Sequence, residues 1–227
     1  MSLKPLAKDI WIYTTKQKFL GVEMGTRMTV VKRSDGGLWV YSPVSLTSEL
    51  KNSLDALGEV KEVICPNRFH HLYAKDYVDA YPQAKLYGAK GLQAKRNDLQ
   101  FDAELDESSV ESWKDDLECV FIYGMPKMNE VVFLHKPSST LIVTDFICNF
   151  KKSQGLFSNL VLKLDGAYGK AAFPLTLRLM MKNKALFRQS VNRVLSWDFD
   201  RVVMCHGEVM EQSAKKQLQD AMLFCLS

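Results

Sequence analysis

Three short apolar segments that each lead to a histidine or an aspartate constrain this chain more than any other feature. The segments and the side chains that follow them are Val60–Cys65 with His70 and His71, Leu141–Thr144 with Asp145, and Arg201–Met204 with His206. Runs rich in valine and isoleucine predict buried strands. Loops at strand ends, held by a rigid sheet, are where α/β proteins gather functional groups. The pattern therefore predicts a sheet that carries polar groups at the ends of its strands.

The rest of the chain alternates predicted strands with predicted helices. Further strands are predicted at Ile10–Tyr13, Met28–Lys32, Leu38–Tyr41, Ala84–Tyr87, Leu117–Tyr123 and Glu130–Leu134, and helices at Leu46–Leu57, Tyr73–Tyr81, most of 155–196 and Met210–Leu226. Thr47 or Ser48 would cap the first helix and Gly58 would end it. The acidic stretch 102–116 is predicted to be a solvated loop or edge. Strands with interspersed helices predict a mixed α+β or α/β sandwich, as a single domain over residues 1–227.

Composition excludes several classes of protein. Hydrophobic residues make up 47% of the 227, enough for a buried core and against disorder. We see no secretory signal and no run near the roughly 18 apolar residues of a membrane span. The five cysteines are widely spaced and form no CxxC pair, so free thiols in a reducing cytoplasm explain them best. The net charge of +4 is mild, and no aromatic and basic strand pattern indicates nucleic-acid binding.

The histidines and Asp145 suit a metal ion, but the residues alone leave other interpretations open. Imidazole and carboxylate groups are ligands of zinc, iron and manganese. A lone histidine, however, often packs in a core or on a surface, and an aspartate after a strand often caps the next helix. His135, beside the Lys136–Pro137 turn, is interpreted as a surface residue.

Taken in order, these segments resemble the metallo-β-lactamase superfamily across nearly the whole chain. The superfamily's motif, a strand followed by T-H-x-H-x-D-H, aligns without a gap with Cys65–His71. Its later strand-and-aspartate motif resembles Val143–Phe146, and its last motif, a strand followed by histidine and glycine, resembles Met204–Gly207. The resemblance is to a divergent branch with a degenerate metal motif. It implies a four-layer αββα sandwich.

The resemblance further implies that one of two metal sites is lost and the other retained. The three histidines of the first site fall on Pro66, Arg68 and Met125, so that site would be empty. The positions of the second site hold four competent ligands, which are His70, His71, Asp145 and His206. The implied cofactor is one divalent metal ion, zinc before iron or manganese, or none if the site is empty. Asp145 would serve as a ligand or as a catalytic base.

Arg68 and Glu130 lie near the positions of the lost site. A guanidinium binds carboxylate or phosphate through two parallel hydrogen bonds, so Arg68 is predicted to hold an anionic substrate in place of the missing cation. A salt bridge from Arg68 to Asp145 or Glu130 is the alternative. Glu130 could be an additional ligand, a partner of Arg68, or a solvated residue at the start of a strand.

Residues 151–201 form a basic, largely helical segment with ten basic and three acidic residues. Its many apolar residues could form a cover that admits an anionic or lipid-like substrate, or that leans on a membrane surface. Helices that face the core, with a solvated basic side, are the simpler interpretation and the preferred one.

Two functions fit this sequence. One is a metal-dependent hydrolase acting on a small anionic ester or phosphoester through the retained site. The other is a non-catalytic metal- or anion-binding module descended from such a hydrolase, because a fold does not fix a function. Either is expected to bind a small anionic molecule in the cytoplasm, without nucleic acid and without an integral membrane span.

Overall fold

The computed structural model describes residues 2–226, and the chain divides into two compact units. The first unit consists of Met1–Thr15, Arg27–Glu118 and Lys136–Ser138, and the second of Lys16–Thr26, Cys119–His135 and Ser139–Ser227. Each unit has its own sheet and its own cluster of buried apolar residues. The single domain that the sequence predicts over 1–227 stays a prediction.

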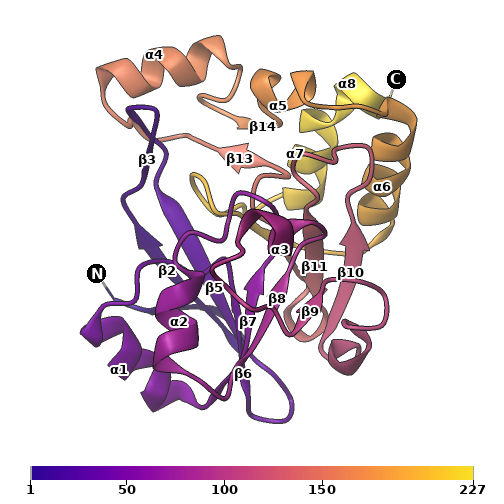
Figure 1. Ribbon diagram of the computed structural model, residues 1–227. Helices are drawn as coiled ribbons and strands as arrows, with labels where there is room; N and C mark the ends of the chain where they lie inside the picture. Colours follow the sequence, from indigo (N-terminus) through magenta and orange to yellow (C-terminus); the bar gives the residue numbers. More distant parts are fainter. Residues whose placement is uncertain (1, 227) are drawn as a thin grey trace. The chain divides into compact units, whose positions relative to one another are not determined.

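A seven-stranded sheet of order β1-β2-β5-β6-β7-β8-β9 forms the first unit (Figure 1). Its strands are β1 (Lys4–Ala7), β2 (Ile10–Thr15), β5 (Thr26–Lys32), β6 (Leu38–Tyr41), β7 (Val60–Cys65), β8 (Lys85–Gly88) and β9 (Ala103–Glu104). The pairs β1·β2 and β5·β6 are antiparallel, whereas β6 to β9 run parallel. Strands β6, β7 and β8 therefore end at one edge, where the histidine-bearing segment leaves β7.

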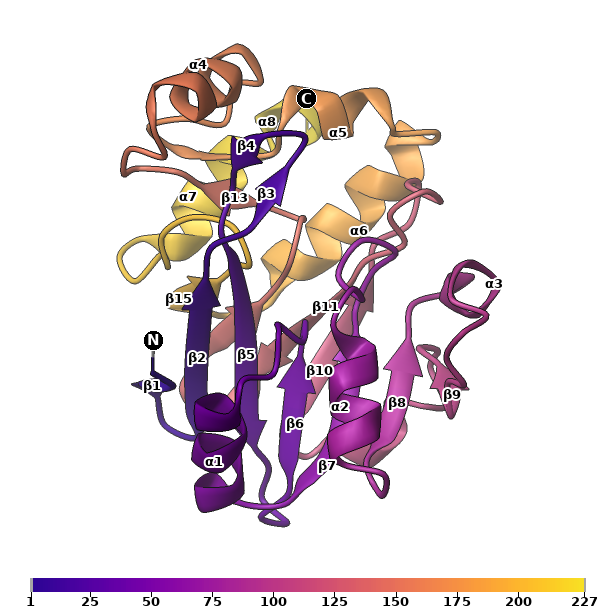
Figure 2. The same cartoon turned by 60° about the vertical axis from the view of Figure 1, so that its left-hand side comes forward.

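Helices supply the crossover connections that parallel strands require. They are α1 (Ser48–Leu57), α2 (Ala74–Ala80) and the short α3 (Leu92–Lys95). Thr47 caps α1, because its hydroxyl accepts the Leu50 N–H at 3.2 Å, and Gly58 follows its last turn. The end at Gly58 was predicted, and Thr47 was one of the two predicted caps. Helices α1 and α2 lie on the same face of the sheet (Figure 2) and bury Leu54 and Tyr77 in its core.

The acidic stretch 102–116 is only partly the solvated edge that was predicted. It contains the edge strand β9, but it also contains a 3-10 turn over Glu111–Trp113. Trp113 is buried, and its ring packs edge-on against Trp39 and Tyr87, with ring centroids 5.9 and 4.8 Å away. One aromatic residue thus ties an otherwise acidic segment to the sheet.

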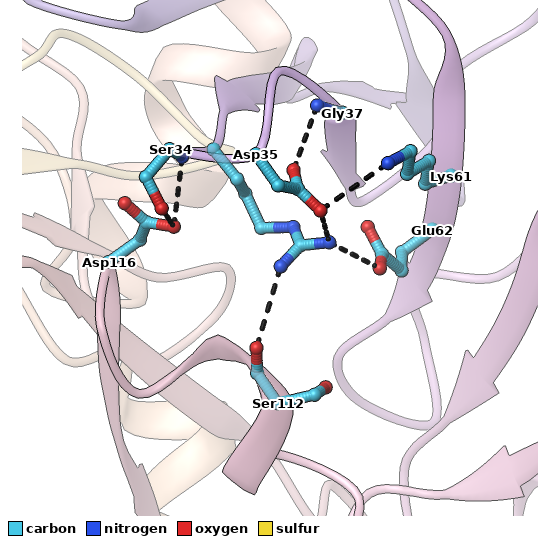
Figure 3. A network of polar contacts seen from close by, with 8 residues as sticks. Ser34, Asp35, Gly37, Lys61, Glu62, Ser112 and Asp116 are labelled. Carbon is cyan, nitrogen blue, oxygen red and sulfur yellow. Dashed lines mark hydrogen bonds and ion pairs between the residues drawn. The ribbon is translucent and has the colours of Figure 1, made fainter.

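A polar network around Arg33 holds the tip of the β5–β6 hairpin (Figure 3). The Arg33 guanidinium donates to Asp35 at 2.8 Å and to Glu62 of β7 at 2.9 Å, and it reaches the carbonyl oxygen of Ser112 at 3.5 Å. The Arg33 and Glu62 side chains are only 9% and 10% exposed. Burial raises the pKa of Glu62, although the charge of Arg33 opposes that rise. A single arginine therefore joins the hairpin, β7 and the 102–116 stretch.

The main sheet of the second unit has the order β10-β11-β12-β15. Its strands are β10 (Leu117–Phe121), β11 (Val131–His135), β12 (Thr140–Ile142) and β15 (Arg201–Val203). Two small antiparallel pairs join β3 (Lys18–Phe19) to β4 (Val22–Glu23) and β13 (Cys148–Asn149) to β14 (Ala171–Ala172). Strands β12 and β15 are parallel neighbours, so their carboxyl ends meet at the same edge.

The helices of this unit are α4 (Leu156–Leu164), α5 (Leu175–Leu179), α6 (Lys184–Ser196), α7 (Ala214–Ala221) and α8 (Leu223–Leu226). Helix α6 faces the core as predicted, with Phe187 and Val191 fully buried. Helix α4 does so on one side only, because Leu162 is buried but Leu156 is 91% exposed. The predicted helix Met210–Leu226 is in fact two helices, and Met210 instead pairs with Val202 of β15.

Three further sequence predictions have clear outcomes. His135 is buried at the end of β11, opposite Thr140, so its interpretation as a surface residue was wrong. All five cysteines are free thiols, as predicted. Within residues 2–226, no helix has the length and apolar character needed to cross a membrane.

Candidate metal centre

Asp145 and His206 lie together in the second unit. Asp145 follows β12 and His206 follows β15, and the parallel pairing of these strands brings both side chains to one edge. The Nε2 atom of His206 is 3.4 Å from Oδ1 of Asp145, and the two side chains are 10% and 12% exposed.

A hydrogen bond at Nδ1, the ring nitrogen away from Asp145, fixes the orientation of the His206 ring. Its Nδ1 atom lies 2.8 Å from the carbonyl oxygen of Gly25, which follows β4. A carbonyl can only accept, so Nδ1 carries the ring proton, and the Nε2 of a neutral ring offers a lone pair. That lone pair faces a carboxylate oxygen, so a proton or a cation is needed between them. Metal-ligating histidines commonly donate their other ring N–H to a backbone carbonyl in this way.

The charge balance of this pair is visible in the pKa of His206. Burial lowers that pKa, but the Asp145 carboxylate and the carbonyl groups of Gly25 and Met24 outweigh burial, and the net direction is upward. The groups around His206 thus favour positive charge at Nε2. A proton can supply that charge, and a divalent metal ion can supply more of it.

Glu130 positions Asp145 through the backbone. Its carboxylate is buried and accepts the N–H of Thr144 at 2.7 Å and that of Asp145 at 2.9 Å. Burial and the nearby charge of Asp145 both raise the pKa of Glu130. The sequence analysis considered Glu130 as a metal ligand, as a partner of Arg68 or as a solvated residue. It did not predict that Glu130 holds the backbone of Asp145. The available signal was the position of Glu130 directly before β11, the strand that pairs with β12.

Gly207 allows the His206 loop to lie against β13. Its φ of +89° is in the left-handed region, and a Cβ atom there would lie 2.2 Å from the carbonyl oxygen of Asn149. Asn149 N–H donates to the His206 carbonyl at 3.1 Å, and Glu208 N–H donates to the Asn149 carbonyl at 2.8 Å. The loop that carries His206 is therefore fixed on both sides of Gly207.

In the first unit, the segment after β7 folds into a tight turn that places His70. The Asn67 side-chain oxygen accepts the N–H groups of Phe69 and His70, both at 2.8 Å. The Nδ1 atom of His70 lies 2.8 Å from the Ser42 hydroxyl oxygen. Asn67 and Ser42 are thus supporting residues, and sequence patterns gave no reason to connect Ser42 with His70.

His71 is held by an arginine. Arg96 donates to Nδ1 of His71 at 3.1 Å and to its backbone carbonyl at 2.8 Å. Because the guanidinium only donates, Nδ1 accepts and the ring proton belongs on Nε2. To bind a metal ion through Nε2, His71 would have to carry its ring proton on Nδ1 instead. That proton would then point at the Arg96 guanidinium, which is itself a donor. Burial, followed by the charges of Lys95 and Arg96, lowers the pKa of His71 to about 4.

We expect His71 to stay neutral well below neutral pH in protein treated with a chelator. Its pKa is about 4 when folded, against 6.5 for an ordinary histidine. The unfolded chain binds more protons between these values, so the free energy of unfolding should fall as pH drops from 6.5 towards 4, by about 2 kcal/mol at pH 5. His71→Gln should lack this contribution. Imidazole NMR measures the pKa directly, and titration of His71 near pH 6.5 would contradict the expectation.

Basic side chains gather beside Arg68 in the first unit. Lys95 of α3 donates to the Arg68 carbonyl at 2.6 Å and lies over the ring of Phe69. Burial, then the charges of Arg68 and Arg96, lower the pKa of Lys95. Arg68 and Arg96 thus add positive charge beside Lys95, part of which Asp98 offsets through its ion pair with Arg96 at 2.7 Å, and an excess of positive charge attracts anions.

Comparison with solved structures shows the fold. A metallo-β-lactamase from Pontibacter korlensis is 12% identical, covers 97% of this chain and 98% of its own, and gives a TM-score of 0.65. One from Hirschia baltica is 11% identical, with 99% and 97% covered and a TM-score of 0.67. The metallo-β-lactamase FIM-1 from Pseudomonas aeruginosa, in its mono-zinc form, is 10% identical, with 100% and 96% covered and a TM-score of 0.66. The predicted mixed α/β fold of the metallo-β-lactamase type is confirmed.

Sequence comparisons agree with a divergent branch. A search among curated proteins finds no match. A family model matches residues 7–161, which is more than half of the chain, and its description is "Domain of unknown function (DUF4336)". The chain therefore belongs to this DUF4336 family, and its fold is that of the metallo-β-lactamases.

Proposed function

We propose that this chain is a hydrolase that uses one divalent metal ion, zinc before iron or manganese, to act on a small anionic ester or phosphoester. The observation that carries the proposal is the Asp145–His206 pair, in which the Nε2 atom of His206 lies 3.4 Å from a carboxylate oxygen while Nδ1 faces a backbone carbonyl. An imidazole and a carboxylate are ordinary zinc ligands. The mono-zinc form of FIM-1 supports a single metal ion on this fold.

The proposed ligands are Asp145, His206 and, by its place in the motif, His70. We leave His71 out of the set, because Arg96 donates to its Nδ1 atom. The first site is proposed to be lost, since its motif positions hold no histidine. Met125, at one of them, is instead packed in the apolar core of the second unit.

Glu130, Asp145 and Arg68 would each have a distinct role in the proposed reaction. The metal would lower the pKa of a bound water and polarise the scissile group. Glu130 holds the backbone of Asp145, so that Asp145 can serve as a ligand or as a base. Arg68 is proposed to hold the anionic group of the substrate, in the positive field it shares with Lys95 and Arg96. The free thiols support a cytoplasmic location.

Metal content tests the site. Protein purified without a chelating tag is expected to contain about one metal ion per chain by elemental analysis. Asp145→Asn and His206→Gln should each weaken metal binding at least tenfold, on the scale known for perturbed metal sites. Asp79→Asn, which changes a side chain 60% exposed on α2, is the matched control. Wild-type protein that binds no added zinc, iron or manganese would contradict the proposal.

Measurement of substrate hydrolysis distinguishes the proposed hydrolase from the alternative, a non-catalytic metal- or anion-binding module descended from such a hydrolase. Metal-loaded protein is expected to hydrolyse at least one member of a panel of esters, lactones and phosphodiesters, and Arg68→Ala should raise the KM for anionic members most. A protein that holds its metal ion but hydrolyses none of them would be a binding module.

A further inference from the structure

An exposed apolar patch covers one side of the second unit. It consists of large side chains from the β3–β4 hairpin and from α4, which are Phe19, Leu20, Leu156, Phe157, Leu160 and Leu164. Each of the six is between 57% and 91% exposed. Scattered apolar residues are normal on a protein surface, but a contiguous set marks a binding surface.

The hairpin and the helix form one surface. The N–H of Glu23 donates to the Ser158 hydroxyl at 2.9 Å, which joins β4 to α4 (Figure 1, Figure 2). On the inner side of the helix, Leu162 packs with Val22 and Phe150. Helix α4 therefore already has a buried apolar side, and the patch is a second apolar side that packing within the unit does not use.

The segments that carry the patch contain more lysines than carboxylates. The hairpin and the segment 151–170 carry six exposed lysines, which are Lys16, Lys18, Lys151, Lys152, Lys163 and Lys170. Their only carboxylates are Glu23 and Asp165. Glu23 accepts the N–H groups of Gln17 and Gly25, and Asp165 accepts two hydrogen bonds from Thr176. Both negative charges are thus already engaged by neighbouring donors, and among the lysines Lys152 pairs with Glu208 at 2.9 Å.

We propose that this patch docks onto an anionic lipid membrane. Leucine and phenylalanine side chains enter the interface between headgroups and acyl chains, and flanking lysines contact anionic headgroups. Helix α4 has nine residues, so it lies on a bilayer and does not cross it. A second copy fits less well, because a two-fold interface would place this patch against the same patch of the partner and bring the lysines of both together.

Sedimentation with vesicles tests the proposal, using the full chain. Vesicles of phosphatidylcholine with about a third phosphatidylserine should retain the protein at low salt, and vesicles of phosphatidylcholine alone should retain far less. Leu156→Glu/Leu160→Glu is expected to weaken binding at least tenfold. Lys18→Gln and Lys170→Gln should each weaken it about fivefold, and added salt should do the same.

The control for the single variant Leu160→Glu is Leu223→Glu, which places one glutamate on α8 of the same unit at a leucine 56% exposed, against 57% for Leu160. It should leave vesicle binding unchanged, and circular dichroism would verify that every variant is folded. Failure of wild-type protein to bind anionic vesicles at low salt would overturn the proposal. Equal binding by the Leu156→Glu/Leu160→Glu variant would also overturn it. Light scattering that shows a dimer abolished by that variant would assign the patch to a second copy instead. None of these readouts depends on metal.

Discussion

Replacing Arg33 with methionine is expected to lower the free energy of unfolding by about 3–5 kcal/mol, the usual cost of breaking a buried ion pair. The variant leaves the Glu62 carboxylate in a site where its side chain is 10% exposed and where burial already raises its pKa. Urea denaturation at pH 8 measures the loss. Without Arg33 the folded state would hold a proton on Glu62 to higher pH, so stability should fall as pH rises and the defect should be smaller at pH 5.

Two comparisons separate this effect from the general cost of losing an arginine. Lys75→Met breaks an ion pair with Asp79 in which both side chains are more than half exposed, and it should change stability by less than about 1 kcal/mol. Arg33→Met/Glu62→Leu removes both buried charges and should recover much of the loss. A single Arg33→Met variant as stable as the wild type at pH 8 would rule out an energetic role for the network.

Gly207→Ala is expected to cost about 2–5 kcal/mol and to weaken metal binding. Part of the cost is a left-handed backbone with a Cβ atom, about 1–2 kcal/mol, and the rest is overpacking, about 1–3 kcal/mol. The nearest atoms to that Cβ are the backbone carbonyl of Asn149 at 2.2 and 2.4 Å and the Phe150 nitrogen at 2.9 Å. Backbone atoms cannot rotate away as a side chain can, so the loop that carries His206 must move.

Gly169→Ala is the matched control for this substitution. Gly169 has nearly the same φ, +85°, and a Cβ atom there would meet nothing within 4 Å. It should show the backbone cost alone, with normal zinc affinity. Thermal unfolding and a zinc titration of both variants give the comparison. Equal losses of stability in the two variants would show that the close approach to Asn149 does not matter.

Local signals explain which elements could be predicted. Helix α1, predicted over Leu46–Leu57 and observed over Ser48–Leu57, could be predicted because its leucine spacing, its candidate caps Thr47 and Ser48 and its end at Gly58 all lie within 13 residues. Strand β7 was predicted with its observed bounds because its apolar residues lie between Gly58 and Pro66, which is also a local signal. Asp145 and His206 were predicted from their places after two apolar strands, and the parallel pairing of those strands explains why they meet.

Contacts between distant segments explain what was missed. The sequence around His71 contains no signal for the hydrogen bond that Arg96 donates to its ring. The sequence around Glu130 likewise contains no signal that its carboxylate will accept the N–H groups of residues 144 and 145. Helix α4 lies within the predicted helical segment 155–196, but the exposure of its apolar side was missed for another reason. An apolar helix normally indicates burial, and only the three-dimensional arrangement shows that one side of it stays exposed.

Gly25 belongs at once to the loop after the β3–β4 hairpin and to the support of His206. Its N–H donates to Glu23 of β4, and its carbonyl accepts from the His206 ring. A ligand that moves the hairpin and a metal ion that moves the ring therefore act on one peptide segment. Thermodynamic reciprocity then requires that any factor by which a bilayer alters metal affinity is the factor by which the metal alters affinity for the bilayer. A factor of one would mean that Gly25 holds its position whichever of the two is bound.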